Sequence, residues 1–202
     1  MELKVVVLAS GRGTNFAAIC DAVQKKQLPK IKITGLICNK KDAGALEHAK
    51  RFGVPSQIIE SKLFLKGGKL DRDTYEKALS EALRKLGPNI ICLAGYMLLL
   101  GPKLVNEWEG KIINIHPSLL PNFRGLRAQH QAIEAKAEWT GCTVHFVTPE
   151  LDAGPVIAQT KIRILPTDTE ASLSDRLLPL EHQTYVEALK KLSETGVTYR
   201  PK

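Results

Sequence analysis

Short aliphatic runs alternate with amphipathic segments through the first half of the chain, and this alternation limits the available folds more than any other feature. The first run, residues 3–9 (LKVVVLA), has the β-branched character of a strand that is buried on both faces. The other expected strands are 32–39, 54–59 and 89–95, and the expected helices are 16–26, 42–53 and 73–87. Strict alternation favours parallel strands joined by crossover helices.

The second half of the chain breaks this alternation. Residues 111–116 (KIINIH) continue the pattern as a strand, and 126–137 follow as a helix. Strands 141–148 and 156–164 are then joined by a loop alone, which predicts an antiparallel pair. The 202 residues suffice for one well-packed domain. We therefore expect an α/β fold, a Rossmann-like open, mostly parallel sheet with helices on both faces and an antiparallel C-terminal strand pair.

Turn and capping residues refine this outline. Thr14 or Asn15 is placed to cap the first helix. Residues 169–196 are expected to form one long closing helix, in which Pro179 permits a break or a kink. Residues 61–72 contain a Gly-Gly pair and are expected to form a loop.

Composition narrows the possible partners and compartments. The net charge is +8, but the positive residues are spread along the chain, so a solvated basic surface is favoured over nucleic-acid binding. Such a charge also suits small anionic ligands. The four cysteines are far apart and lie in apolar runs, which indicates free buried thiols in a reducing cytoplasm and argues against a zinc site. The apolar N-terminal run is too short for a membrane span and does not have the form of a signal peptide.

The stretch SGRGTN, residues 10–15, lies between the first strand and the first helix. Glycines allow the backbone to approach a ligand closely, and a helix N-terminus offers free N–H groups to an anion. The candidate phosphate-binding residues are Gly11, Gly13, Thr14 and Asn15. The stretch is neither a P-loop nor a complete G-x-G-x-x-G motif, because Phe16 stands at the third glycine position. An ordinary tight turn explains the spacing equally well.

Asn114 and His116 are two residues apart at the end of an expected strand, so their side chains leave the same face. Pro117 ends that strand, which places the pair at a carboxyl edge, where α/β sheets bind ligands. An amide and an imidazolium N–H could together stabilise an oxyanion, and histidine also moves protons near neutral pH. For an isolated Asn-x-His pair, however, the commoner arrangement is an asparagine that caps the strand end and a histidine that is hydrogen bonded to the backbone.

Three more polar residues are candidates. Asp152 lies in the loop ELDAGP, where a carboxylate near a histidine would favour the imidazolium, although aspartate is also a common turn residue and spacing does not pair it with His116. His145 alternates with apolar residues and fits a hydrogen-bonded core histidine. Glu181, on the closing helix, is able to bind a sugar hydroxyl or an amine, with a solvated helix face as the default interpretation.

Three motifs in this order carry a family resemblance. They are VVVLASGRGTNF (5–16), NIHPSLLPNFRG (114–125) and TVHFVTPELDAGPVI (143–157). Together they closely resemble the phosphoribosylglycinamide formyltransferases of purine biosynthesis, over roughly residues 4–190. The wider formyltransferase family shares the His-Pro-Ser-Leu-Leu-Pro element and the L-D-x-G loop, and SGRGTN narrows the resemblance to the glycinamide ribonucleotide branch.

The resemblance implies an activity. The formyl group of 10-formyltetrahydrofolate, a cosubstrate, would be transferred to the amine of 5-phosphoribosylglycinamide in de novo purine (IMP) biosynthesis. The products would be N-formylglycinamide ribonucleotide and tetrahydrofolate. The amine would attack directly through a tetrahedral oxyanion, with no bound cofactor and no metal. The implied partners are these small molecules, without nucleic acid or membrane.

The resemblance also implies residue roles. Asn114, His116 and Asp152 match the catalytic trio, in which Asn114 and protonated His116 stabilise the oxyanion and Asp152 keeps His116 charged. The implied ribonucleotide-binding residues are Gly11, Gly13, Thr14, Asn15, Ser118 and Glu181. The implied folate-binding residues are Arg72, Met97, Leu98, Leu99, Leu100, Asn114, Thr148 and Asp152.

The sequence departs from the family pattern at three places. Leu98 stands where relatives often carry arginine, so backbone contacts are expected to bind the folate there. Gln129 stands where relatives often have histidine, and His130 lies next to it. The stretch 62–69, near the expected folate entrance, is a few residues longer than the family pattern.

Other family branches and one other class remain as alternatives. A methionyl-tRNA formyltransferase is expected to carry a further C-terminal domain, a deformylase of this family an N-terminal regulatory domain, and a Rossmann-like nucleotide-binding protein would lack catalysis altogether. We expect a single formyltransferase domain over 1–202, with a nucleotide-binding half at 1–100 and a catalytic and folate half at 101–202. A cytoplasmic monomer or homodimer is expected.

Overall fold

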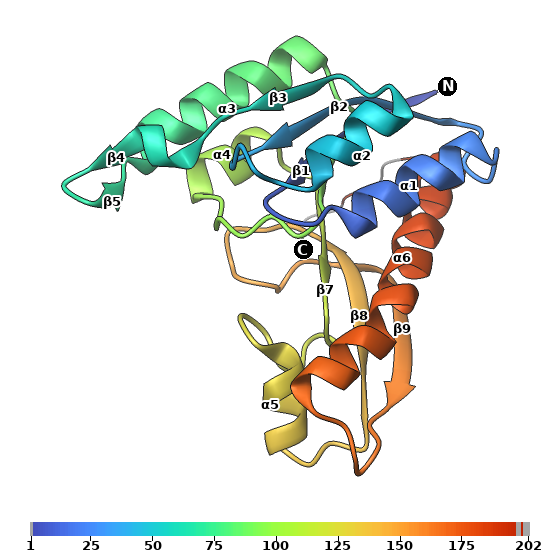
Figure 1. Ribbon diagram of the computed structural model, residues 1–202. Helices are drawn as coiled ribbons and strands as arrows, with labels where there is room; N and C mark the ends of the chain where they lie inside the picture. The colour runs from blue at the N-terminus through green and yellow to red at the C-terminus, as the bar shows by residue number, and fades with distance from the viewer. Residues whose placement is uncertain (1, 197–198, 200–202) are drawn as a thin grey trace.

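The main feature of the computed structural model, which describes residues 2–196 and 199, is a seven-stranded sheet in the order β3-β2-β1-β6-β7-β8-β9 (Figure 1). Its strands are β1 (Leu3–Ala9), β2 (Ile31–Cys38), β3 (Ser56–Ile58), β6 (Ile90–Leu93), β7 (Ile112–His116), β8 (Trp139–Phe146) and β9 (Val156–Arg163). The helices are α1 (Thr14–Gln24), α2 (Ala45–Phe52), α3 (Arg72–Leu86), α4 (Pro102–Glu107), α5 (Ala128–Glu134) and α6 (Glu170–Thr195).

The strand directions confirm the expected mixed sheet. β3, β2, β1, β6 and β7 are paired in parallel, whereas β8 is antiparallel to β7 and β9 is antiparallel to β8. The direct β8–β9 connection explains the change, because a short loop can join antiparallel neighbours only. Figure 1 shows β7, β8 and β9 extending away from the N-terminal half, with α6 along one side of them.

Helices cover both faces of the sheet, and each face has its own core. On one face α1 and α6 contribute Phe16, Ile19, Tyr185 and Leu189, all fully buried. On the other face the buried residues of α3, with those of α4 and Trp108, form a second apolar cluster. Because β1 and β6 are buried on both sides, their sequences are continuous apolar runs rather than alternating ones.

The structure corrects the expected cap of the first helix. The N-cap of α1 is Gly13, in the left-handed region at φ 74°, and neither Thr14 nor Asn15 acts as the cap. A Cβ on Gly13 would lie 2.5 Å from the Cα of Ala45, so only glycine fits there. The close approach of the loop to α2 therefore decides the cap, and this was invisible in the local sequence.

The stretch 61–72, expected as a loop, contains regular structure. It forms the 3₁₀ helix η1 (Ser61–Phe64) and a small hairpin of β4 (Leu65–Lys66) and β5 (Lys69–Leu70). Gly67 and Gly68 both have positive φ, at 57° and 78°, which is what a tight two-residue hairpin turn requires. The hairpin leads directly into α3 (Figure 1).

The closing helix forms as expected and is continuous through Pro179. It begins with a capping box, in which the Thr169 side chain accepts from the Ser172 N–H and the Ser172 side chain accepts from the Thr169 N–H. Within the part of the chain that the structure describes, no helix is both long and apolar enough to cross a bilayer.

Removing this cap tests how firmly α6 is anchored. Thr169→Ala should lower the free energy of unfolding by about 1 kcal/mol, because one N–H of the first turn loses its acceptor. Urea denaturation monitored by circular dichroism measures the change. Thr195→Ala, at the far end of the same helix, is the matched control and should change stability less. Equal losses in both variants would contradict a specific capping role.

Candidate active site

The candidate site lies at the carboxyl edge of the sheet, where the strand order reverses. The chain leaves β1 toward β2 and β3 on one side and returns to β6 on the other, so loops after β1 and β6 diverge there. Open α/β sheets bind ligands at such a switch point. The loop after β1 carries the phosphate-loop candidates, and the loop after β6 carries the 97–100 stretch. His116 is the last residue of β7.

Asp152 and His116 meet at this edge, although they are far apart in sequence. His116 is 6% exposed and its Nδ1 lies 3.4 Å from Asp152 Oδ2. The same carboxylate oxygen accepts a hydrogen bond of 2.9 Å from the N–H of Gly125. On the other side of the ring, His116 Nε2 lies 2.8 Å from the carbonyl oxygen of Phe123. Both ring nitrogens therefore face acceptors, an arrangement that suits an imidazolium.

His145 completes this cluster, and sequence reasoning had assigned it to the core. Its Nε2 lies 3.6 Å from Asp152 Oδ1, and its Nδ1 lies 2.8 Å from its neighbour's carbonyl oxygen. It is 2% exposed, so it is a core histidine as well as a neighbour of the site. The strand register explains the contact, because Asn114 on β7 is paired directly with His145 on β8, and Asn114 Nδ2 lies 3.5 Å from His145 Nε2.

The surroundings of Asp152 keep it ionised. Burial alone would raise the pKa of its carboxyl, but the neighbouring His145 ring, the Gly125 N–H and the charge of His116 outweigh burial and lower the pKa below its usual 3.8. Asp152 itself has a positive φ of 47°, which aspartate tolerates better than most residues. The ELDAGP loop thus presents a fixed carboxylate rather than a solvated turn residue.

The phosphate-loop candidates lie close to the end of β1. Gly11 is exposed, whereas Gly13 packs against α2. Asn15 is 7% exposed, and its Nδ2 donates a hydrogen bond of 3.0 Å to Glu181 Oε2 on α6. Asn15 Oδ1 is buried without a partner among the described residues. An unpaired buried acceptor is costly, so a ligand donor would be favoured beside it.

Glu181 is positioned by this contact. Burial raises the pKa of its carboxyl, and the hydrogen bond from Asn15 and the charge of Arg12 only partly offset that rise. Ionised Glu181 therefore costs folding free energy at neutral pH. A buried carboxylate held under this cost is a candidate functional group.

A pocket of about 300 Å³ adjoins the cluster on the side of the 97–101 stretch. Its lining includes the predicted residues Arg72, Leu98, Leu99, Leu100, Asn114, Thr148 and Asp152, together with Tyr96, His145 and Val147. Met97, although predicted, is not part of this lining and is 68% exposed. The pocket lining is largely apolar with a few polar groups, as small-molecule sites usually are.

Other predicted positions have local structural partners. Ser118 is fully buried, and its hydroxyl donates a hydrogen bond of 2.6 Å to the carbonyl of Asn122, so it presents no surface to a ligand in this structure. Gln129 is 8% exposed and donates to Ser174 on α6, whereas His130 lies at the surface, 3.7 Å from Glu134. The structure therefore does not bring His130 into the place of a buried histidine at position 129.

The cysteines are separate from this chemistry. All four are buried and free. Burial raises the pKa of the Cys20 and Cys92 thiols to about 12, so they are protonated at neutral pH. A protonated buried thiol is a poor nucleophile and a poor metal ligand. No group of His, Cys, Asp and Glu side chains suited to a metal ion is present among the residues that the structure describes.

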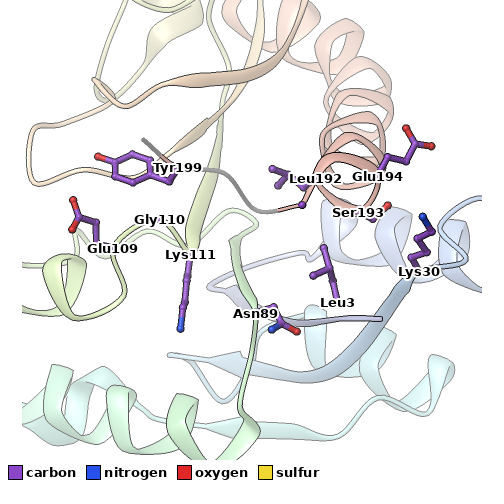
Figure 2. A pocket seen from close by; sticks show the side chains of 11 residues that line it. Leu3, Lys30, Asn89, Glu109, Gly110, Lys111, Leu192, Ser193, Glu194 and Tyr199 are labelled. Atoms are coloured by element: carbon purple, nitrogen blue, oxygen red, sulfur yellow. The ribbon is translucent and has the colours of Figure 1, made fainter. Parts of the chain in front are cut away.

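A second hollow, of about 740 Å³, lies at the opposite edge of the sheet (Figure 2). Leu3, Asn89 and Lys111 line it, all at or just before the amino ends of strands, with Glu194 and Tyr199 on the other side. Its size exceeds that of the pocket beside Asp152, but it lies at the edge where parallel α/β sheets do not hold their sites. The convergence of polar groups, rather than volume, identifies the candidate site.

Comparison with known proteins decides the family. The family model described as Formyl transferase matches residues 3–189. The chain belongs to the formyl transferase family. It is 37% identical over 183 residues to phosphoribosylglycinamide formyltransferase of Escherichia coli, covering 91% of this chain and 84% of that protein.

Further relatives agree with this assignment. The chain is 38% identical to the trifunctional purine biosynthetic protein adenosine-3 of Gallus gallus over 97% of its own length, but spans only 19% of that larger protein. The crystal structure of glycinamide ribonucleotide transformylase 1 from Symbiobacterium toebii superposes with a TM-score of 0.91 at 37% identity, covering 98% of this chain and 91% of that one. Members of this formyl transferase family thus share both the sequence pattern and the fold.

The raised pKa of Glu181 gives a prediction about stability. Because the folded-state pKa lies above the unfolded value of 4.5, ionised Glu181 lowers stability progressively as pH rises through and beyond 4.5. Glu181→Gln should therefore raise the melting temperature at pH 7, and this gain should vanish below pH 4.5. Thermal unfolding at several pH values measures it. Glu187→Gln, on the same helix, is the control. A gain that persists at low pH would refute the assigned cause.

Proposed function

We propose that this chain transfers the formyl group of 10-formyltetrahydrofolate to the amine of 5-phosphoribosylglycinamide, in purine biosynthesis. Support comes from relatives named for this activity that cover most of the chain, such as those of Escherichia coli and Haemophilus influenzae. The single observation that carries the proposal is the buried Asp152–His116 pair, with Asp152 and Asn114 both lining an apolar pocket. Oxyanion donors supported by a fixed carboxylate are a combination suited to acyl transfer.

The chemistry follows from these groups. The amine nitrogen attacks the formyl carbon, and the carbonyl oxygen takes up negative charge in a tetrahedral intermediate. Asn114 Nδ2–H and His116 Nε2–H are the proposed donors to that oxygen. The bond between the formyl carbon and the folate nitrogen then breaks, and a proton moves from the attacking amine to that nitrogen. Asp152 is proposed to keep His116 charged during this exchange.

The Phe123 carbonyl indicates where the oxyanion would lie. In this structure it accepts the hydrogen bond from His116 Nε2 at 2.8 Å, and a formyl oxygen is an acceptor of the same kind. Phe123 has a positive φ of 56°, an unusual conformation for an aromatic residue. The substrate oxygen is therefore proposed to replace this carbonyl, with a local shift of the loop after His116.

Ribonucleotide binding is proposed at the loop after β1. Gly11, Gly13 and Thr14 would offer backbone N–H groups and the N-terminus of α1 to the phosphate. The unpaired Asn15 Oδ1 and the carboxylate of Glu181 would accept hydrogen bonds from the ribose hydroxyls or the glycinamide amine. Ser118 would support this site through the loop that it holds rather than by direct contact.

Folate binding is proposed in the 300 Å³ pocket. Leu98 and Leu100 would contact the pterin ring with apolar side chains and backbone groups, and Thr148, which also lines the pocket, would be a further contact. Arg72, which lines the pocket and has an exposed side chain, would face the acidic tail of the folate. Met97 is proposed as an outer contact, since it is exposed beside this wall.

The remaining expectations are part of the same proposal. The nucleotide-binding half, 1–100, and the catalytic and folate half, 101–202, would form one domain. The enzyme would act on small molecules, as a monomer or homodimer in the cytoplasm. Its free, buried cysteines suit a reducing compartment.

A formyl-transfer assay with glycinamide ribonucleotide and 10-formyltetrahydrofolate tests the proposed activity. Asn114→Ala should lower kcat roughly 100- to 1,000-fold, because one oxyanion donor is lost. His130→Ala, a histidine outside the cluster, is the control and should retain activity. Nucleotide binding without formyl transfer by the wild-type protein would instead favour a non-catalytic binding module.

Asp152→Asn tests the carboxylate separately. This change keeps the shape but removes the charge that favours imidazolium, so kcat should fall about 100-fold. The KM values should change little, because the lost support belongs to the transition state. Steady-state kinetics with both substrates varied gives this distinction. An unchanged kcat would contradict the role given to Asp152.

A further inference from the structure

The first turns of α3 hold the segment 96–101, which forms one wall of the 300 Å³ pocket. At the start of this segment, the hydroxyls of Tyr75 and Tyr96 are hydrogen bonded to each other in the core. In its middle, Arg72 donates to the carbonyl of Leu99. The segment has no regular secondary structure of its own before α4 begins, so side-chain contacts such as these hold it in position.

Glu76 holds the far end of the segment. Its Oε1 accepts a hydrogen bond of 2.6 Å from the N–H of Gly101, and lies 3.6 Å from Arg72 Nη1. The residue is only 7% exposed. A Cβ on Gly101 would come within 2.9 Å of Glu76 Oε2, so the glycine allows the carboxylate to approach the backbone closely. One buried carboxylate thus joins the helix, the segment and Arg72.

Glu76 does not line the pocket itself. Burying a carboxylate is expensive unless it is paired and hydrogen bonded, and here Arg72 and the Gly101 N–H supply both. Well-packed apolar residues often replace such buried charges without loss of stability. The presence of a carboxylate at position 76 is explained by the position that its contacts impose on the pocket wall.

We propose that Glu76 is a positioning residue for the formyl donor, acting through Gly101 and Arg72. This inference rests on the proposed function, since it assigns the neighbouring pocket to the folate. Loss of the contact would let the wall between Leu98 and Gly101 move and would weaken binding of the donor. The ribonucleotide, which is proposed to bind at the loop after β1, would be affected much less.

Two substitutions of Glu76 distinguish the loss of the hydrogen-bond acceptor from the loss of the charge alone. Glu76→Ala removes the acceptor, so the KM for 10-formyltetrahydrofolate should rise about tenfold. Glu76→Gln keeps an oxygen that can accept from Gly101, so its KM should stay within about threefold of wild type. In both variants kcat and the KM for the ribonucleotide should stay within about twofold, because the wall contacts the donor equally in ground and transition states.

Glu107→Gln is the matched control. Glu107 also accepts hydrogen bonds from α3, from Ser80 and Arg84, but it touches neither the segment nor the pocket. Its substitution should leave every kinetic constant within about twofold of wild type. If Glu76→Ala does not fold, Glu76→Asp replaces it, since the shorter side chain keeps the charge but withdraws its oxygen from Gly101 and should raise the same KM.

Hydrogen exchange gives a reading that does not depend on activity. In the absence of substrates, backbone amides of 97–101 should exchange faster in Glu76→Ala or Glu76→Asp than in wild type, while those of β7 remain unchanged. An unchanged exchange rate, an unchanged donor KM, or an equal rise of both KM values would each overturn the positioning role. If the wild-type protein does not transfer the formyl group, only the proposed function is contradicted. The hydrogen-exchange result would still decide whether Glu76 holds the pocket wall.

Discussion

The buried carboxylate of Asp152 is the interaction on which the arrangement of the site depends. Its two oxygens face His116 and His145, and the Gly125 N–H fixes it from a third direction. A charge with so little solvent contact is tolerated only where several partners compensate for lost hydration. The loops after β7 and β8 are both drawn to this point. The carboxylate therefore determines the shape of the catalytic end of the pocket as well as its charge.

The topology of the sheet brings the residues around Asp152 together. Parallel strands bring the ends of β1, β6 and β7 to one edge, and β8 runs back antiparallel to β7, so that His145 lies beside Asn114 at the level where β6 ends. The loops there also contact each other. Met97 N–H donates to the Ser10 hydroxyl at 2.8 Å, and Ser10 N–H donates to the carbonyl of Gly95 at 3.1 Å. The loop after β1 and the pocket wall thus share hydrogen bonds.

Much of the fold could be predicted because local patterns and long-range packing agree. The first strand was predicted at its observed bounds, Leu3–Ala9, since a strand between two helical layers must be apolar throughout. α4 was not predicted, because its six residues carry too little periodicity to stand out beside an apolar run. The hairpin at Leu65–Leu70 was predicted as a loop, although its Gly-Gly pair was a usable signal for a tight turn.

The sequence by itself determined the class of fold, the order of the motifs and the side chains available for chemistry, because periodicity and turn residues act locally. Only the tertiary structure decided which of these side chains meet. His145 joined Asp152 through the register of β7 and β8, and Gly13 became a cap because α2 lies against it. Glu76 drew Gly101 and Arg72 together from separate elements. Such contacts depend on packing between elements distant in sequence, which no local pattern records.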